Sequence, residues 1–304
     1  MTPVVDVVAA LDVGGTRTKA ALVDRSLRVL ARTTAPTPPD IGRDIGASVS
    51  ASVRRLVDDL GDGRPARLVR CGVVVPGIVD ESTGTGLLSV NLGWRDLPVR
   101  DAVEAAVGVP TEVGHDVRAG LIAESRLGAA RGARNVLFVA VGTGIAGALM
   151  LDGSVVSADG RAGELGHMTI DPEGPACPCG GAGCLEVIAS AAAIGREYAA
   201  RSGRTVDAET VARLATAGEP TAVAVWGRAV GALARAIVTT VTITGVDLVL
   251  IGGGLAESGE TLLGPLRRDV AERLTFQRPP RVSKASLGDR AGCLGAACLA
   301  WDAQ

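Results

Sequence analysis

The chain contains the same arrangement of strand, glycine turn and strand twice, and this repeat constrains its fold more than any other feature. Residues 7–24 read VVAALDVGGTRTKAALVD, and residues 135–151 read NVLFVAVGTGIAGALML. Both stretches place β-branched and small apolar residues on either side of a glycine-rich turn, a pattern that predicts a hairpin. Two hairpin-led halves indicate an internal duplication. We therefore predict an α/β fold with two domains that face each other across a cleft.

The segments around the hairpins predict helices and further strands. Helical patterns cover residues 45–61, 97–108 and 116–132 and most of 190–245, and buried strands are expected at 67–77 and 246–254. No stretch has the length or composition of an interdomain linker. We place the hinge near residues 110–120, which predicts an N-terminal domain over residues 1–115 and a C-terminal domain over residues 116–287.

Composition and charge exclude several classes of partner. The 304 residues include 31 basic and 33 acidic side chains, for a net charge of -2, so no overall field attracts nucleic acid or an anionic membrane. The N-terminus lacks a basic region, and its apolar run stops at Asp12, well short of the roughly 20 residues that span a bilayer. We therefore expect a cytoplasmic protein with a small neutral or phosphorylated ligand.

The turn of the first hairpin has the features of a phosphate-binding loop. Gly14 and Gly15 allow a ligand to approach the backbone amides because they have no side chain, and Thr16 adds a hydroxyl donor. Asp12, at the strand end, is suited to hold the water shell of Mg²⁺ beside phosphate oxygens. A plain tight turn is the alternative interpretation.

Two further glycine turns strengthen the nucleotide interpretation, although each alone is more often structural. One is the turn of the second hairpin and the other follows the strand at 246–254. Together with the first turn, they match a nucleotide held by both halves of a duplicated fold. The residues concerned are Gly142, Thr143, Gly144, Gly252, Gly253 and Gly254.

A cluster of metal-binding residue types lies within residues 163–186, GELGHMTIDPEGPACPCGGAGCLE. His167, Cys177, Cys179 and Cys184 form a Cys3His set suited to tetrahedral zinc. Because the protein would supply all four ligands, we expect the zinc to be structural. Unpaired loop thiols are the alternative.

Two glutamates flank this cluster. Glu164 lies three residues before His167, and Glu186 lies two residues after the last cysteine. Closure of a metal loop would bring both carboxylates and the imidazole to one wall, where they could accept hydrogen bonds from several hydroxyls. This arrangement predicts a sugar site, with solvated surface carboxylates as the alternative.

The motifs together resemble the ROK proteins, bacterial sugar kinases and sugar-responsive repressors of the actin-like, hexokinase-type ATPase superfamily. The matching stretches are LDVGGTRTKAALVD, VPGIVD, NLGW, HDVRAGLIAE, VGTGIAGALMLDG, AGELGH, CPCGGAGCLE and LVLIGGG. The resemblance implies two RNase H-like domains, with a C-terminal helix at about residues 288–304 returning to the N-terminal one. It also implies Mg-ATP deep in the cleft and sugar at its mouth. The first two glycine turns would contact phosphates, and Gly252–Gly254 would contact adenosine.

The resemblance also assigns a catalytic base. The family has the aspartate of an Asn-Asp pair at the start of a helix beyond the hinge, which here is Asp116 in GHDVRAG. A carboxylate at that place can accept the proton of an attacking sugar hydroxyl, whereas without the resemblance it would read as a helix N-cap. The chain departs from the family at His115, where asparagine usually contacts the sugar, and at Arg118, which brings a charge near the site.

The resemblance implies an ATP-dependent kinase acting on a hexose 6-hydroxyl, most similar to glucokinases. Gly77, Asn91 and Trp94 would line the sugar pocket, with a strand-end turn and a packing tryptophan as the alternative. The other functions considered are an N-acetylmannosamine or N-acetylglucosamine kinase and a non-catalytic sugar sensor. Family repressors have a DNA-binding segment before the hairpin, which here begins by residue 9, so the kinase is favoured. Family members are commonly homodimers or homotetramers.

Overall fold

The computed structural model describes residues 4–60 and 65–303. Gly61, the last residue of one predicted helix, lies outside the described residues. The chain divides into two compact units. Unit 1 comprises Met1–Arg126, Ser157–Ala162 and Asp289–Gln304, and unit 2 comprises Leu127–Val156 and Gly163–Gly288.

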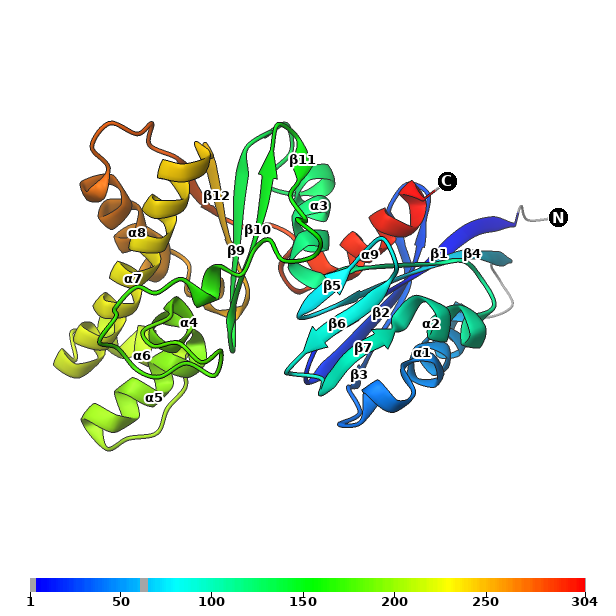
Figure 1. Ribbon diagram of the computed structural model, residues 1–304, viewed down its shortest axis with the longest axis horizontal. Helices are drawn as coiled ribbons and strands as arrows, with labels where there is room; N and C mark the ends of the chain where they lie inside the picture. Colours follow the sequence, from blue (N-terminus) through cyan, green and yellow to red (C-terminus); the bar gives the residue numbers. More distant parts are fainter. Residues whose placement is uncertain (1–3, 61–64, 304) are drawn as a thin grey trace. The chain divides into compact units, whose positions relative to one another are not determined.

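Unit 1 is built on a five-stranded sheet with the order β3-β2-β1-β4-β8, of which Figure 1 labels β1 to β4. The predicted first hairpin is present, because β1 and β2 pair antiparallel and Asp12 lies opposite Lys19. β4 pairs parallel with β1 and with β8. The strands are β1 Val5–Val13, β2 Arg17–Asp24, β3 Val29–Pro36, β4 Ala66–Val75 and β8 Thr111–His115.

Helices cover both faces of this sheet. Alternate residues of β1 point to opposite faces, so Leu11 packs in the core with α1 Ile45–Leu60 and α2 Val99–Val107, while Ala10 packs against α9 Ala291–Asp302. The backbones are close on the α9 side, because a Cβ on Gly72 would clash with an α9 carbonyl. α9 therefore returns the C-terminal end of the chain to unit 1.

A small three-stranded sheet, not expected from the sequence, connects β4 to α2. It consists of β5 Ile78–Asp80, β6 Thr85–Ser89 and β7 Trp94–Pro98. Trp94 is buried in the unit 1 core, which agrees with the alternative of a packing tryptophan. α3, Asp116–Leu127, starts directly after β8 and is shorter than the predicted helix over 116–132. Short 3-10 turns are η1 Ile41–Arg43 and η4 Gly288–Arg290.

Unit 2 repeats the hairpin-led design of unit 1. Its five-stranded sheet has the order β11-β10-β9-β12-β13, with β9 and β10 antiparallel and β9, β12 and β13 parallel. The predicted second hairpin and the strand leading to the glycine run are therefore both present. The strands are β9 Val136–Val141, β10 Ile145–Leu151, β11 Ser154–Val155, β12 Leu248–Gly252 and β13 Arg281–Lys284.

Helices of unit 2 pack on this sheet around one large apolar core. They are α4 Leu185–Ala189, α5 Ala191–Ser202, α6 Ala208–Thr216, α7 Pro220–Thr244 and α8 Glu260–Arg273, with 3-10 turns η2 Leu165–His167 and η3 Gly254–Ser258. Of the helices that the structure describes, α7 alone is long and apolar enough to cross a membrane by length and composition. Because 61% of its apolar window is buried, α7 has the character of a core helix.

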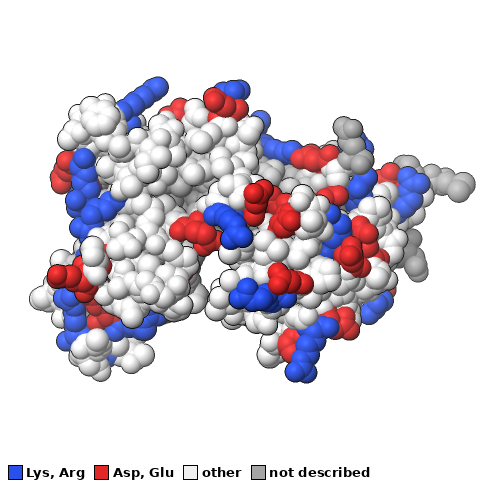
Figure 2. Space-filling model, viewed as in Figure 1, with Lys and Arg blue, Asp and Glu red and all other residues white. Residues whose placement is uncertain are grey.

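The charged side chains are mixed in sign on the face drawn in Figure 2. Lys and Arg lie among Asp and Glu there, between wide uncharged areas. This distribution agrees with the near-zero net charge of the sequence.

Candidate active site

The first glycine turn is braced by a threonine from the end of the neighbouring strand. Thr37 donates from Oγ1 to the Gly14 carbonyl at 2.7 Å, and its N–H donates to the Thr16 carbonyl at 3.0 Å. Gly15 and Thr16 are exposed at the tip. A Cβ on Gly15 would lie 3.6 Å from the Asn91 Cβ, so the structure brings Asn91 beside this turn.

Asp12 lies in a densely packed part of unit 1. Its side chain is 17% exposed, and a Cβ on Gly292, at the start of α9, would lie 2.5 Å from its Oδ2. Burial, followed by the charge of Asp116, raises the pKa of Asp12 to about 7, with Lys19 acting in the opposite direction. The carboxylate is therefore costly to ionise when no cation is bound beside it.

We expect Asp12→Asn to stabilise the ligand-free protein above about pH 7 by about 1–2 kcal/mol. The folded pKa of about 7 exceeds the ordinary value of 3.8, so the folded state binds more protons between these values and stability falls as pH rises through that window. The neutral amide removes this loss. Urea unfolding at about pH 8 should show the gain, and at about pH 4 the two proteins should converge. An unchanged or lowered stability at the higher pH would contradict this explanation.

Asp116 occupies the first position of α3. Its Oδ1 accepts the Val117 N–H at 2.7 Å and lies 3.4 Å from Nε2 of His115. Although 28% of its side chain is exposed, burial raises the pKa of Asp116. His115 itself is buried, and its Nδ1 lies 3.4 Å from the Arg118 backbone N–H. The structure thus brings Asp116 and His115 together.

Arg118 is buried, and its charge is compensated within unit 1. The side chain is 2% exposed, and its Nε donates to Oε1 of Glu81 at 3.0 Å. Nη1 donates to the carbonyls of Gly160 and Ala162 at 3.3 and 3.2 Å. Arg118 thus lies near Asp116, and its charge acts to lower the Asp116 pKa, but its side chain is held by Glu81 and by two backbone carbonyls. No local pattern in the sequence signals this pairing, because Glu81 and Arg118 are 37 positions apart.

Gly77 is required by the backbone between β4 and β5. Its φ is +103°, and a Cβ there would clash with the Leu88 carbonyl. A structural reason therefore exists for this glycine whether or not it also contacts a ligand.

The glycine turn of unit 2 contacts one of the predicted sugar-binding glutamates. Gly142 and Gly144 close the turn with a 2.9 Å backbone hydrogen bond, and Thr143 is exposed. Glu186, in the first turn of α4, accepts the Ile145 N–H at 2.8 Å through Oε2. A side chain on Gly144 would clash with this carboxylate.

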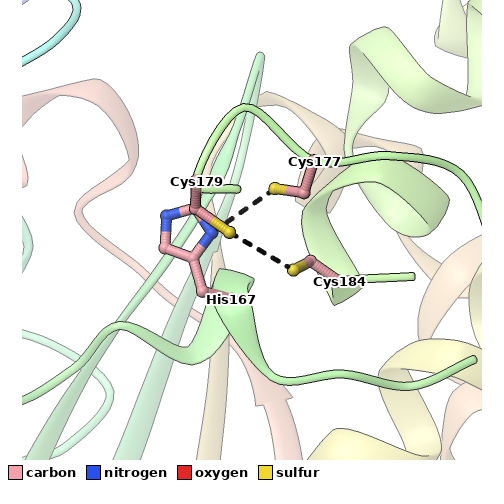
Figure 3. Close-up of side chains that lie close together, drawn as sticks. All are labelled: His167, Cys177, Cys179 and Cys184. Carbon is pink, nitrogen blue, oxygen red and sulfur yellow. Dashed lines mark hydrogen bonds between the residues drawn. The ribbon is translucent and has the colours of Figure 1, made fainter. Parts of the chain in front are cut away.

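The predicted metal ligands converge in one loop of unit 2. One donor atom from each of His167, Cys177, Cys179 and Cys184 lies within 4.8 Å of all the others, and Figure 3 shows the four side chains pointing toward one another. Cys179 and Cys184 Sγ are 3.7 Å apart, and Cys177 Sγ is 3.7 Å from His167 Nδ1. Zinc–sulfur bonds of about 2.3 Å in a tetrahedron require sulfur separations of about 3.8 Å, so this donor set fits zinc.

The imidazole of the cluster has a second nitrogen directed elsewhere. His167 Nε2 lies 3.9 Å from Glu164 Oε2, while its Nδ1 faces the sulfur atoms. Both side chains are partly exposed, at 38% and 45%. This part of the loop therefore presents a nitrogen and a carboxylate together at the surface of unit 2.

An open cavity of about 670 Å³ lies in unit 2 beside the glycine run. Gly253 has a φ of +77° and packs against the Val141 carbonyl, whereas Gly254 lines the cavity. The volume lies in the range of small-molecule sites. Other lining residues are Asp207, Arg213, Thr216, Glu257 and Thr261.

Residues 8–303 match the ROK family. The chain belongs to this family. A glucokinase of Thermotoga maritima is 32% identical over 310 residues, covering 95% of each chain. An N-acetylmannosamine kinase of Citrobacter koseri is 34% identical over 298 residues, covering 96% of this chain and 97% of that one.

A solved ROK structure has the same fold. The ROK family glucokinase of Streptomyces griseus, in complex with glucose and AMPPNP, superposes with a TM-score of 0.82 at 27% identity, covering 98% of this chain and 100% of that one. The α/β prediction and the suspected family are confirmed. The two hairpin-led units are the RNase H-like units of the actin-like ATPase fold.

Several residues of this ROK chain were not found by sequence reasoning. Thr37, which braces the first turn, and Glu81, which pairs with Arg118, lie outside every motif. Asp207 caps the N-terminus of α6 by accepting the Thr210 N–H, and only that capping pattern was visible in the sequence. The places of Thr37 and Glu81 depend on contacts between segments far apart in the chain.

Proposed function

We propose that this protein is an ATP-dependent hexose kinase that transfers the γ-phosphoryl group to the sugar 6-hydroxyl. The observation that carries the proposal is Asp116, a partly exposed carboxylate with a raised pKa at the start of α3, in the unit that holds the glycine turn and Asp12. The Val117 N–H holds one carboxylate oxygen, which leaves the other to accept a proton. This is the arrangement required of a general base.

In the proposed reaction, Asp116 takes the proton of the 6-hydroxyl as that oxygen attacks the γ-phosphorus. The bond between the γ-phosphorus and the β,γ-bridging oxygen breaks, and ADP leaves. Amides of the two glycine turns and the Thr16 hydroxyl orient the phosphates. Asp12 is suited to hold Mg²⁺ through water, and the bound ion would neutralise developing phosphate charge.

We further propose that the loop of the Cys3His cluster binds the sugar. Zinc held by the four residues would fix the loop, so that Glu164, His167 and Glu186 are held in place to accept sugar hydroxyls. Asn91, beside the first turn, and His115 and Gly77 are the proposed contributions of unit 1. The cavity beside Gly254 has the size for the adenosine of ATP, with Gly252 and Gly253 shaping its wall.

Glucose is the proposed substrate, because glucokinases occur among both the curated relatives and the solved structures. The similar N-acetylmannosamine kinase makes an N-acetylhexosamine the second candidate. An ADP-release assay with Mg-ATP over glucose, mannose, fructose, allose, N-acetylglucosamine and N-acetylmannosamine tests the proposal. Turnover of glucose above the others is expected. Sugar binding without any turnover would indicate a sensor.

The remaining expectations are proposals about the cellular form. We propose a cytoplasmic homodimer or homotetramer that acts on small molecules and binds neither nucleic acid nor membrane. We also propose that units 1 and 2 work as its two domains. Their first boundary lies after Arg126 instead of near residue 115, and their last lies after Gly288, close to the division at 287/288 expected from the sequence.

The kinase should lose activity as pH falls through the raised pKa of Asp116. Only the ionised carboxylate can accept the hydroxyl proton, so the acidic limb of kcat/KM for the sugar should lie above the ordinary aspartate value of 3.8. A pH profile with sugar as the varied substrate measures this limb. A rate that stays constant down to the ordinary value would exclude Asp116 as a base with a raised pKa.

A further inference from the structure

We propose that Lys19 is a catalytic residue that contacts the transferring phosphoryl group. This inference rests on the proposed kinase function and adds a cation to it. Lys19 lies within the quoted stretch LDVGGTRTKAALVD, in β2 beyond the glycine turn, but the sequence analysis assigned it no role.

The sheet register places Lys19 beside the proposed magnesium and phosphate residues. Lys19 lies directly opposite Asp12 in the β1–β2 pair, and directly paired residues extend from the same face of a sheet. Nζ of Lys19 is 3.8 Å from Oδ2 of Asp12. Lys19 follows Thr16 by three positions, and its ammonium lies on the face of the sheet that carries the Asp12 side chain.

The ammonium is held in place but remains accessible. Nζ donates to the Asp289 carbonyl at 3.0 Å, and the side chain is 30% exposed. One donated hydrogen bond leaves two further N–H groups of the ammonium for an incoming phosphate. A backbone carbonyl fixes the direction of Nζ without neutralising its charge.

The charges around Asp12 explain why a cation is needed there. Asp116 and Asp289 both act electrostatically against ionisation of Asp12, and Lys19 favours it. A triphosphate arriving among these carboxylates would meet repulsion. A positive charge on the phosphate side of Asp12 offsets part of that repulsion and stabilises the charge on the γ-phosphoryl oxygens as the β,γ-bridging bond breaks.

Two narrower roles compete with this proposal. Lys19 could act only as a charge partner of Asp12, or only as a tether between β2 and the Asp289 segment. A tether would affect a nucleoside triphosphate and a monophosphate alike, because it touches no phosphate. A charge partner of Asp12 would act through the Mg²⁺ that Asp12 is proposed to hold, so it would change the affinity for Mg-AMPPNP but not for AMPPNP without metal. Contact with the terminal phosphate would change the affinity for AMPPNP both with and without Mg²⁺ and leave the AMP affinity unchanged, which gives a measurement that does not depend on sugar turnover.

The test compares the wild type with Lys19→Met and Lys19→Arg. Calorimetry would measure the affinities for Mg-AMPPNP, for AMPPNP with EDTA in place of Mg²⁺, and for AMP, and an ADP-release assay would measure kcat with glucose. We expect Lys19→Met to lose affinity for AMPPNP by about tenfold both with and without Mg²⁺, to keep its AMP affinity, and to lose about 10- to 100-fold in kcat. Lys19→Arg, which keeps the charge, should recover part of both losses. The matched control is Arg67→Met, which removes an exposed cation of unit 1 that pairs with Asp6. It should change neither the nucleotide affinities nor kcat.

Each outcome decides the proposal. If Lys19→Met lost affinity for Mg-AMPPNP and for AMP equally, Lys19 would have a structural role and the proposal would be overturned. The same would follow if both Lys19→Met and Lys19→Arg lost affinity and had a lowered melting temperature. An AMPPNP affinity that is unchanged in Lys19→Met, either with Mg²⁺ or without it, would also overturn it. If the wild type phosphorylates no sugar, the proposed kinase function fails. The ratio of the AMPPNP affinity to the AMP affinity, in the wild type and in Lys19→Met, still tests phosphate contact by Lys19.

Discussion

Asp116→Asn should lower kcat for sugar phosphorylation by about 10²- to 10⁴-fold. The amide has nearly the same shape as the carboxylate and still accepts the Val117 N–H, which is 2.7 Å from Oδ1 in the wild type. It cannot accept the hydroxyl proton. Sugar and Mg-AMPPNP should therefore bind within about threefold of their wild-type affinities, and the loss should lie in kcat rather than in KM.

The appropriate control is Asp6→Asn, a substitution of an exposed aspartate of unit 1 that pairs with Arg67 on the surface. It removes one carboxylate from the same unit and should leave kcat unchanged. If Asp116→Asn instead raised KM for the sugar and kept kcat, Asp116 would be a binding residue and another group would take the proton.

Cys184→Ala should abolish metal binding and weaken sugar binding. The thiol is buried, and its Sγ lies 3.7 Å from that of Cys179, so its removal leaves three ligands where structural zinc needs four. The loop that positions His167 and Glu186 would then be unrestrained. We expect metal content to fall from about one zinc per chain to nearly none, and KM for the sugar to rise about 10- to 100-fold.

Cys71→Ala is the matched control, because Cys71 is a buried thiol of unit 1 outside the cluster. It should keep the zinc and the sugar affinity. Elemental analysis gives the metal content, and titrations with glucose and with Mg-AMPPNP separate the two ligands. Loss of nucleotide affinity with intact sugar affinity in Cys184→Ala would be the opposite of the expected result.

The hairpins and the metal-ligand cluster were accessible from the sequence because their signals are local. Alternating apolar residues around Gly14–Gly15 and Gly142–Gly144 predicted both hairpins, and the structure confirms them. The Cys-x-Cys-x4-Cys spacing, with His167 ten residues earlier, predicted a set of donors, which the structure brings within 4.8 Å. The family followed from the order of such motifs.

The parts that the sequence did not predict depend on pairing between distant segments. β5 to β7 are only three to five residues long, too short for a periodic pattern to be distinguished from a loop. Arg118 becomes a buried, compensated cation only because Glu81 and two carbonyls of another segment reach it. Lys19 gains its place through cross-strand register with Asp12.

The most direct test of the account is the ³¹P NMR spectrum of the products that the wild type forms from Mg-ATP and glucose. Asp116 as a base acting on the 6-hydroxyl predicts glucose 6-phosphate and ADP in equal amounts, with no ADP formed when glucose is left out. ADP formed equally well without glucose, or a phosphate on another hydroxyl, would contradict the account.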